Sequence, residues 1–136
     1  MNRSNLTFPK NERLSRKRHI DMLFQQGSSF VAHPLRVIYL PISPEGTPVV
    51  DGLSLAPVSM FVSVPKKKIK HAVDRNYIKR RIRESYRLRK ADLFQSYAGK
   101  NKLLQLAIIY LSQEKVTFAK IDRAMEKVIC ALMKNN

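Results

Sequence analysis

Lysine and arginine are concentrated in one stretch of the sequence, 66-KKKIKHAVDRNYIKRRIRESYRLRK-90. It contains twelve basic residues and two acidic ones, Asp74 and Glu84. Arginine guanidinium groups clamp phosphate oxygens through paired hydrogen bonds, whereas lysine ammonium groups act as point charges. The chemistry that this composition favours is therefore the non-covalent binding of a polyanion.

Apolar residues interrupt this stretch at helical intervals. We suppose that residues 73–89 form a helix with about 100° per residue. Five side chains then fall on one arc about 100° wide: Asn76, Lys79, Arg80, Arg83 and Arg87. Ile78 and Ile82 lie together beside this arc, and Val73 and Tyr77 lie on its other side. A disordered tail would not need isoleucines at that spacing, so the pattern predicts a helix that buries one edge and exposes a strip of cations.

The simplest alternative is an ordinary solvated helix face, in which Glu84 pairs locally with Arg80 or Arg87. With so few acids, however, cations at i, i+4 spacing repel one another by a few tenths of a kcal/mol per pair. A membrane-surface helix is a second alternative, but the arc lacks the Trp, Phe and Leu wedge of an interfacial helix. A polyanion that neutralises the stripe explains it better, and the pattern favours nucleic acid.

Other side chains could add recognition to such a surface. Asn76 could reach a base edge or a sugar hydroxyl. Phe24, Tyr39 and Tyr77 could stack on unpaired bases, although each is by default a core residue. The sequence leaves their role open between base stacking and the core.

The whole chain is strongly basic, and its charge is unevenly distributed. Its 136 residues carry a formal net charge of +16, and 44% of them are hydrophobic, as in a single globular domain. Residues 1–19 form a second basic segment, and residues 20–65 are nearly neutral. A single cysteine, Cys130, excludes an intramolecular disulfide and a zinc site built on several cysteines. With no secretory signal or apolar span in the sequence, we expect a cytoplasmic protein that binds no membrane.

The domain organisation and the first helix are predicted from turn and capping residues. Residues 1–13 are expected to form a flexible basic arm, and residues 14–136 a single domain. A helix is expected between an N-cap at Ser15 and a stop at Gly27. Its apolar side carries Ile20, Leu23 and Phe24.

Three strands and a closing helix complete the prediction. Branched and aromatic residues predict strands at 34–40, 58–64 and 103–111, with a loop at 41–52. Thr117 can cap a final helix whose apolar residues form one stripe: Ile121, Ala124, Met125, Val128, Ile129 and Leu132. A mixed α+β domain accommodates this order, with helices laid on a small sheet. The two strands that flank the basic helix could be parallel neighbours, with that helix as the crossover.

The segment 67-KKIKHAVDRNYIKRRIRE-84 resembles the signature of the bacterial ribonuclease P protein component, K-K-x-x-x-A-V-x-R-N-x-x-K-R-x-x-R-E. Ten residues stand at the matching positions: Lys67, Lys68, Ala72, Val73, Arg75, Asn76, Lys79, Arg80, Arg83 and Glu84. The first helix also ends in the F-x-x-G-x-S pattern of that family, with Phe24, Gly27 and Ser29. The resemblance extends over most of the chain in the order of its elements.

The resemblance implies a fold of the ribosomal protein S5 domain 2-like type, in the order α-β-β-β-α-β-α with a left-handed β-α-β crossover. It also implies a noncatalytic protein subunit of an endoribonuclease. In this family the RNA subunit, with magnesium, hydrolyses the bond that frees the mature 5′ end of transfer RNA. The implied partners are therefore ribonuclease P RNA and precursor tRNA, and no DNA.

The resemblance further implies two contact surfaces. The residues expected to face the catalytic RNA are those of the basic segment: Lys67, Lys68, Arg75, Asn76, Lys79, Arg80, Arg83 and Arg87. The residues expected to line a cleft for the single-stranded 5′ leader are Ile20, Phe24, Val37 and Tyr39. No catalytic residue and no metal ligand is assigned to the protein.

The chain departs from the family pattern at three places. Tyr77 stands where many members carry a further basic residue, so one phosphate contact is missing or replaced by stacking. Ile20 occupies the inner aromatic position of the first helix. Met60 and Phe61 stand where a glycine is usual, after a long loop at 41–57, which leaves the register of the strand at 58–65 open.

Three rival functions are weaker on the same residues. An independent nuclease would need clustered carboxylates or histidines, but the acids are scattered and His19, His33 and His71 are far apart in sequence. A DNA-binding helix-turn-helix would need a helix directly before the basic one, where Pro65 and a strand stand instead. A structural or ribosome-associated RNA-binding protein could use the same basic helix, and only the matched signature argues against it.

Overall fold

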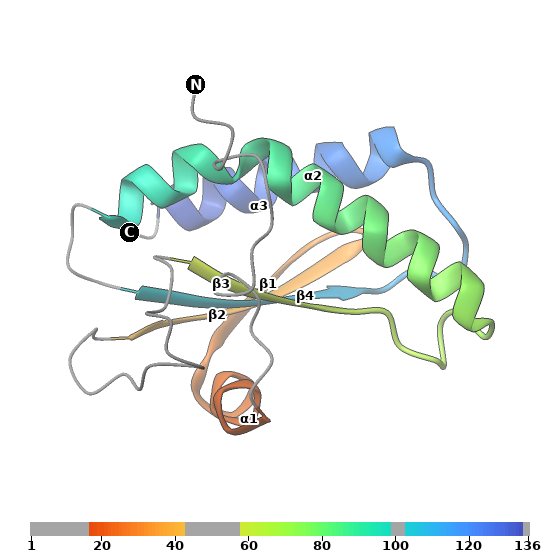
Figure 1. Cartoon of the computed structure of the whole chain (residues 1–136), viewed down its shortest axis with the longest axis horizontal. Helices are drawn as coiled ribbons and strands as arrows, with labels where there is room; N and C mark the ends of the chain where they lie inside the picture. The colour runs from red at the N-terminus through yellow and green to blue at the C-terminus, as the bar shows by residue number, and fades with distance from the viewer. Residues whose placement is uncertain (1–16, 43–57, 99–102, 135–136) are drawn as a thin grey trace, which may run out of the picture.

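The computed structural model of the chain describes residues 17–42, 58–98 and 103–134 (Figure 1). The elements follow in the order α1 (Lys17–Gln26), β1 (Ser28–Ala32), β2 (Leu35–Ile42), β3 (Val58–Ser63), α2 (Ala72–Ala98), β4 (Leu103–Tyr110) and α3 (Phe118–Lys134). This confirms the predicted α+β class and its α-β-β-β-α-β-α order. The predicted basic arm, the domain boundary after residue 13, the Ser15 cap and most of the predicted loop lie outside the described residues.

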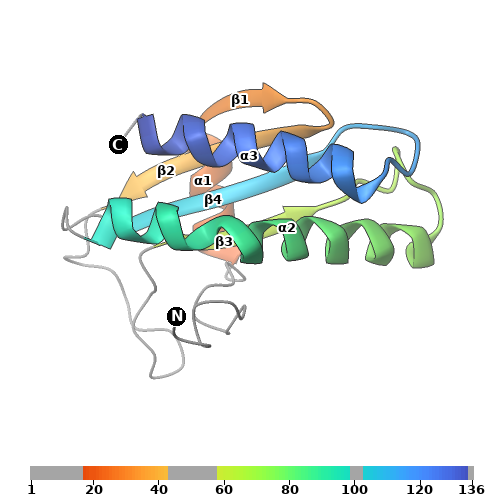
Figure 2. The same cartoon turned by 90° about the horizontal axis from the view of Figure 1, so that it is seen from above.

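The strands form one mixed sheet in the order β1-β2-β4-β3. β2 pairs antiparallel with β1 and with β4, whereas β3 pairs parallel with β4 from Val58↔Leu104 to Ser63↔Ile109. In Figure 2, where α2 and α3 face the reader, β3 and β4 both run to the right and β4 lies above β3. The crossover through α2 is therefore left-handed, as the family resemblance implies and against the common right-handed rule.

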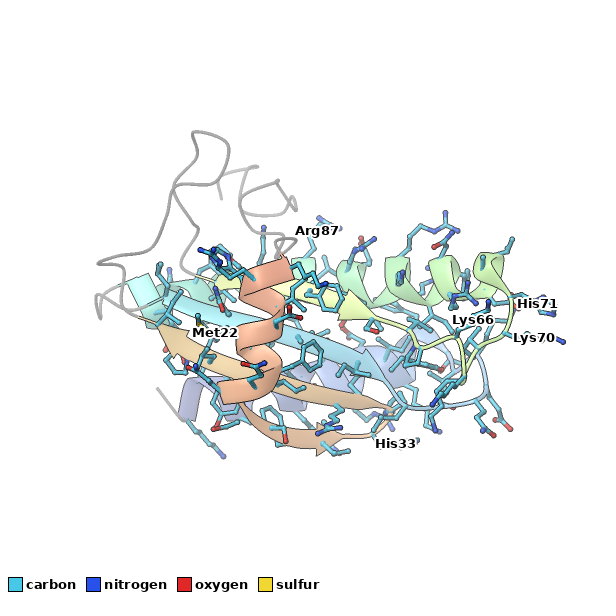
Figure 3. The ribbon with its side chains drawn as sticks, turned by 90° about the horizontal axis from the view of Figure 1, so that it is seen from below. Met22, His33, Lys66, Lys70, His71 and Arg87 are labelled. Atoms are coloured by element: carbon cyan, nitrogen blue, oxygen red, sulfur yellow. The ribbon has the colours of Figure 1, made fainter. Side chains whose placement is uncertain are left out.

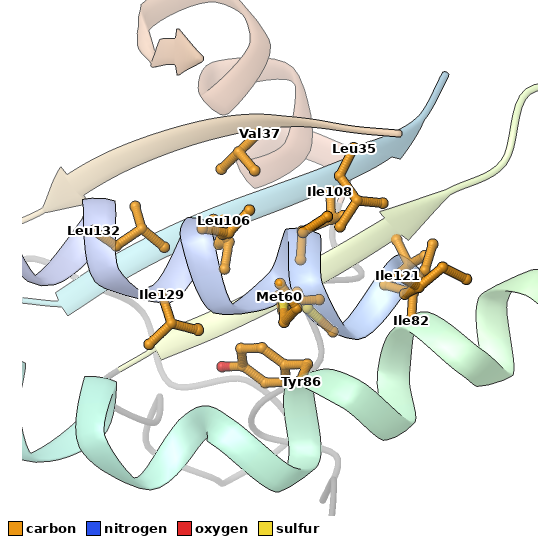
Figure 4. Close-up of a cluster of buried hydrophobic side chains, with 14 of the residues drawn as sticks. Leu35, Val37, Met60, Ile82, Tyr86, Leu106, Ile108, Ile121, Ile129 and Leu132 are labelled. Carbon is orange, nitrogen blue, oxygen red and sulfur yellow. The ribbon is translucent and has the colours of Figure 1, made fainter. Parts of the chain in front are cut away.

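The helices cover both faces of the sheet. α2 and α3 lie side by side on one face, and α1 crosses the other (Figures 1 and 2). The larger core fills the space beneath α2 and α3, where Ile82 and Tyr86 of α2 and Ile121 of α3 meet strand residues such as Leu106 (Figure 4). A smaller cluster of Leu23, Ile38 and Ala107 joins α1 to the sheet. Such burial stabilises by roughly 1.5–3 kcal/mol per large side chain.

α1 ends at Gln26, directly before the predicted stop at Gly27, and the packing at Gly27 leaves no room for a side chain. The Gly27 N–H donates to the Leu23 carbonyl at 2.8 Å. A Cβ at this position would lie 2.5 Å from that same oxygen and 2.8 Å from Cγ2 of Ile38. The glycine therefore allows the end of α1 to lie directly on β2.

The strands differ from the predicted ones at β1 and at the end of β2. β1 has only five residues, of which Phe30 and Ala32 pack against the larger core while Val31 between them is exposed, so its alternation is too short to be recognised in the sequence. β2 continues through Pro41 to Ile42, where a loop is expected from residue 41. β1 pairs with β2 only up to Tyr39. Among the described strands Pro41 therefore has a neighbour on one side only, β4, and proline is tolerated at such an edge position.

α2 has 27 residues and runs well past the predicted end at residue 89. Its buried side continues from Tyr86 through Leu93 to Tyr97, which are all nearly inaccessible to solvent. Lys90 is also buried within this side, and its ammonium lies 5.4 Å from the centre of the Phe94 ring. A lysine at a core position interrupts the apolar pattern, which is why the sequence predicts a shorter helix.

α3 has the predicted stripe, and all six predicted residues are buried. The Lys120 N–H donates to Oγ1 of Thr117 at 3.3 Å, which confirms the predicted cap. Cys130 is exposed, off the stripe. None of the helices in the described parts of the chain is both long and apolar enough to span a membrane.

Polar contacts of Asp122 join α3 to α2. Its carboxylate accepts from the Arg89 guanidinium at 2.8 and 3.0 Å and from the Ser85 hydroxyl at 2.7 Å. These hydrogen bonds favour the ionised form, so the pKa of Asp122 is held below its usual value, and Asp122 in turn raises the pKa of Arg89. The pair is partly exposed, so solvent screens part of the attraction.

We expect Asp122→Asn to lower the free energy of unfolding by about 1 kcal/mol at neutral pH, because the ionised partner of Arg89 is lost. A depressed carboxyl pKa stabilises the folded state above the ordinary Asp pKa, and this contribution is lost as the pH falls through the folded-state value. The difference in the free energy of unfolding between the variant and wild type should therefore be constant above about pH 5 and shrink below about pH 4. Urea unfolding at several pH values measures it.

Asp92→Asn is the matched control, because Asp92 is an exposed carboxylate on α2. It should change the free energy of unfolding by less than about 0.5 kcal/mol. A deficit of Asp122→Asn that does not vary with pH would contradict the assigned charge interaction.

Candidate nucleic-acid interface

The loop after β3 begins the basic surface. The N–H groups of Lys68 and Ile69 both donate to the Pro65 carbonyl, at 3.0 and 3.1 Å, which closes a turn, and the Ile69 side chain is buried. Lys66 and Lys67 of this turn are exposed, and Lys68 is half-buried. Figure 3 shows the labelled side chains of this loop gathered beside the N-terminal end of α2.

Arg75 joins this loop to α2. Its Nη1 donates to the Ile69 carbonyl at 3.0 Å and to the Lys70 carbonyl at 2.7 Å, and the side chain is half-buried. The residue is predicted to face RNA, and the structure gives it a role in fixing the loop. Both functions are compatible because a guanidinium has five N–H donors.

The predicted arc is present on the exposed side of α2. Its central residues Asn76, Arg80 and Arg83 are exposed, and with Val73 they line an open depression of about 460 Å³. Lys79 is half-buried beside them. Among the described residues no acidic side chain lines this depression, so its field favours an anion.

A second depression of about 350 Å³ lies next to the first and shares Arg80 with it. It is lined by Tyr77, Arg80, Arg81 and Glu84. Arg81 is exposed and was not among the predicted contact residues. Its guanidinium carbon lies 4.8 Å from the centre of the Tyr77 ring, which is cation–π geometry.

Arg87, at the far end of the arc, is paired within the helix. Its Nη2 and Nε donate to the two oxygens of Glu84 at 2.6 and 3.1 Å. This contact lowers the pKa of Glu84 and raises that of Arg87, because each charge favours the other. The sequence leaves open whether Glu84 pairs with Arg80 or with Arg87, and among the described ion pairs it pairs with Arg87. The positive charge of Arg87 is therefore neutralised in part, more than that of Arg80.

Lys115 adds a cation from the segment between β4 and α3. Its Nζ lies 3.1 Å from Oδ1 of Asp74 and 5.7 Å from the centre of the Tyr77 ring. Sequence reasoning missed this residue, because no local pattern connects it to a helix that begins more than forty positions earlier. Tyr77, for which the sequence left stacking and core roles open, is 37% exposed and lies near both Arg81 and Lys115.

The four predicted leader residues do not lie on one face of the sheet. Phe24 is 44% exposed on α1, and Ile20 packs beside Leu23 on the α1 face of the sheet. Val37 is fully buried in the larger core, and Tyr39 also packs against that core, on the opposite face (Figure 4).

Strand alternation explains this difference. Successive side chains of β2 point to opposite faces of the sheet, so Ile38 and Leu40 face α1, while Val37 and Tyr39 do not. Tyr39 instead meets the Phe30 ring of β1 edge-to-face, with the ring centres 5.9 Å apart.

The three histidines lie on separate parts of the fold. His19 is buried in α1, whereas His33 and His71 are exposed at the β1–β2 turn and just before α2. Within residues 17–42, 58–98 and 103–134, no three His, Cys, Asp or Glu residues are placed to hold a metal ion.

Comparisons with known proteins agree with this architecture. A family model described as Ribonuclease P matches residues 8–133. The ribonuclease P protein component of Porphyromonas gingivalis strain W83 is 36% identical over 126 residues, which cover 93% of this chain and 86% of that protein. The corresponding protein of Chlorobium phaeobacteroides is 34% identical over 112 residues, 78% of this chain and 73% of that one.

The fold is also shared with solved structures. The RNase P protein of Staphylococcus aureus has a TM-score of 0.63 to this chain at 20% identity, over 88% of this chain and 94% of that one. The RNase P protein of Thermotoga maritima gives a TM-score of 0.60 at 20% identity, over 87% and 94%. The chain belongs to the ribonuclease P protein family, whose known function is the processing of transfer RNA at its 5′ end.

Proposed function

We propose that this chain is the noncatalytic protein subunit of a cytoplasmic ribonuclease P holoenzyme. In that enzyme the RNA subunit, with magnesium, hydrolyses the bond that frees the mature 5′ end of precursor tRNA. The protein binds the RNA subunit through α2 and the loop before it, and it contacts the 5′ leader near α1. Residues 14–136 act as one domain, preceded by the basic arm.

The acid-free depression on α2 is the observation that carries this proposal. Asn76, Arg80 and Arg83 present donors on one side of a rigid helix, and Lys67 and Lys68 extend the surface into the preceding loop. Side chains at this spacing can follow the phosphates of a folded RNA. Arg75 and Arg87 border the same surface but also make contacts within the protein.

The leader contact is proposed for Phe24 together with Ile20. An exposed phenylalanine offers a flat apolar surface on which unpaired bases of any sequence can stack. Val37 and Tyr39 are not included, because they lie on the other face of the sheet.

Magnesium is assigned to the RNA subunit in this proposal. The described residues bring no set of carboxylates together, and oxygen ligands are what this ion requires. The phosphates of the RNA supply such ligands. The part of the protein is to neutralise phosphate repulsion around them and to hold the substrate.

Cleavage of a precursor tRNA by bacterial ribonuclease P RNA at low magnesium tests the proposal. We expect cleavage at the mature 5′ end only when the RNA and this protein are both present. Tight binding to the RNA without any support of cleavage would make the chain a structural RNA-binding protein instead. Cleavage by the protein alone would show that it carries catalytic residues.

We expect Arg80→Ala to weaken binding to ribonuclease P RNA and to reduce the slope of log affinity against log salt by about one unit, because one phosphate contact is lost. Filter binding at several salt concentrations measures this. Arg123→Ala removes the same charge from the exposed side of α3 and is the control. If both variants lose the same slope, net charge and not the arc on α2 determines binding.

We expect Phe24→Ala to bind the RNA subunit as wild type does, but to lose most of the dependence of substrate affinity on leader length. Stacking on an aromatic ring is worth about 1–3 kcal/mol per base, so the loss should be about fivefold or more. Precursor tRNAs with leaders of increasing length provide the measurement. Met133→Ala, which removes a similarly exposed apolar side chain from α3, should have no effect. Equal losses in both assays would mean that Phe24 serves the fold.

A further inference from the structure

The segment between β4 and α3 brings Lys115 to the side of α2 that carries the exposed arginines. The Nζ of Lys115 lies 3.1 Å from Oδ1 of Asp74, in the first turn of α2, and 5.7 Å from the centre of the Tyr77 ring. The guanidinium carbon of Arg81 lies 4.8 Å from the centre of the same ring. The ammonium group is therefore part of the basic surface, although Lys115 belongs to a different part of the chain.

A buried tyrosine fixes the backbone on both sides of Lys115. The Tyr110 ring is inaccessible to solvent, and its hydroxyl donates to the Glu114 carbonyl and accepts from the Val116 N–H at 3.2 Å. Glu114 and Val116 are the two chain neighbours of Lys115. Because the hydroxyl uses its one donor and an acceptor site in these bonds, the segment is attached to the core directly at Lys115.

Two further hydrogen bonds hold the start of this segment. The Leu111 N–H donates to the Pro34 carbonyl at 2.8 Å, and the Glu114 N–H donates to Oγ of Ser112 at 3.1 Å. None of these bonds involves the side chain of Lys115. The lysine therefore extends from a backbone that the fold holds independently of it, so its ammonium lies near α2 before RNA binds.

The ammonium of Lys115 retains donors for a further anion. An ammonium has three N–H donors, and the hydrogen bond to Asp74 uses one of them. The side chain is 53% exposed, so a phosphate oxygen can approach it from solvent, and an ion pair exposed in this way contributes little to stability. Asp74 also lies in the first turn of α2, where the helix dipole stabilises its negative charge. Lys115 can therefore bind a phosphate without leaving an isolated charge buried in the protein.

We propose that Lys115 binds a backbone phosphate of the RNA subunit, in place of the basic residue that many family members carry at the position of Tyr77. The inference rests on the proposed function and adds to it a contact from outside α2 and the loop before it. The chain has no cation at position 77, but the tertiary fold supplies one within cation–π distance of the ring there. Tyr110 is the residue that positions this cation.

The salt dependence of RNA binding tests the contact. We expect Lys115→Ala, made in the full chain, to reduce the slope of log affinity for bacterial ribonuclease P RNA against log salt by about one unit. Between about 50 and 200 mM salt, the affinity of wild type should then fall about fourfold more than that of the variant. Lys127→Ala removes the same side chain from the exposed side of α3 and should leave the slope unchanged.

Tyr77→Arg tests whether Lys115 replaces the missing basic residue. In the Lys115→Ala background it should restore the lost unit of slope, because a guanidinium at position 77 can reach the same phosphate. In the wild-type background it should add much less, since Lys115 already holds that phosphate. An equal gain in both backgrounds would show two independent contacts and would contradict the replacement.

Tyr110→Phe tests the positioning, because it keeps the buried ring and removes only the hydroxyl. We expect it to reduce the salt slope as Lys115→Ala does, and the double variant should have the same slope as Lys115→Ala alone. Urea unfolding must show that each variant is folded under the binding conditions. A hydroxyl that served only the stability of the fold would lower the free energy of unfolding and leave the slope as in wild type.

The inference is overturned if Lys115→Ala keeps the wild-type slope, whether or not it lowers the free energy of unfolding. The bond between Lys115 and Asp74 would then serve the fold alone. In that case, support of cleavage by the wild-type protein at low magnesium would leave the proposed function intact. Failure of wild type both to bind the RNA and to support cleavage would instead remove the proposed function itself.

Discussion

The packing of one side of α2 against the sheet determines what the opposite side can bind. Ile78, Ile82, Tyr86, Leu93 and Tyr97 are all buried along this side, at roughly 1.5–3 kcal/mol each. The helix is also the connection between two adjacent parallel strands, β3 and β4, so both of its ends are fixed. The cations on its exposed side are therefore held at constant spacing before any RNA is bound. A flexible basic tail would lose conformational entropy on binding, which this helix has already lost on folding.

The acids around α2 are placed so that they leave the centre of the arc positive. Asp74 pairs with Lys115, and Glu84 pairs with Arg87. Asp122 on α3 accepts from Arg89, on the flank between the two helices. The pairs of Asp74 and Asp122 join α2 to the segment before α3 and to α3, whereas the pair of Glu84 and Arg87 lies within the middle of α2. The acid-free depression between them keeps a charge that is repulsive within the free protein, and a polyphosphate chain relieves that repulsion.

The sequence predicts this surface well because its signals are local. The arc, the α1 stop and the α3 stripe all follow from spacing within one element, and the structure contains them. Local spacing could not show which face of the sheet Val37 and Tyr39 occupy. Both faces of β2 are covered, so its sequence shows no clear alternation of polar and apolar residues. The sequence predicts too short an α2, because the buried Lys90 interrupts its apolar pattern. Lys115 reaches Tyr77 only through the tertiary fold, so no sequence pattern could have found it.

The position of α1 relative to α2 gives the protein two separate surfaces. α1 and its exposed Phe24 lie on one face of the sheet, whereas α2 and its arc lie on the other face (Figure 1). In the proposed holoenzyme the leader and the RNA subunit therefore contact opposite layers of one rigid domain. A domain of this kind contributes to catalysis without a reactive group, because it holds the substrate at a fixed place relative to the RNA that cleaves it. The core beneath α2 and α3 thus has a functional consequence, since any loosening of the sheet would change the distance between the two RNAs.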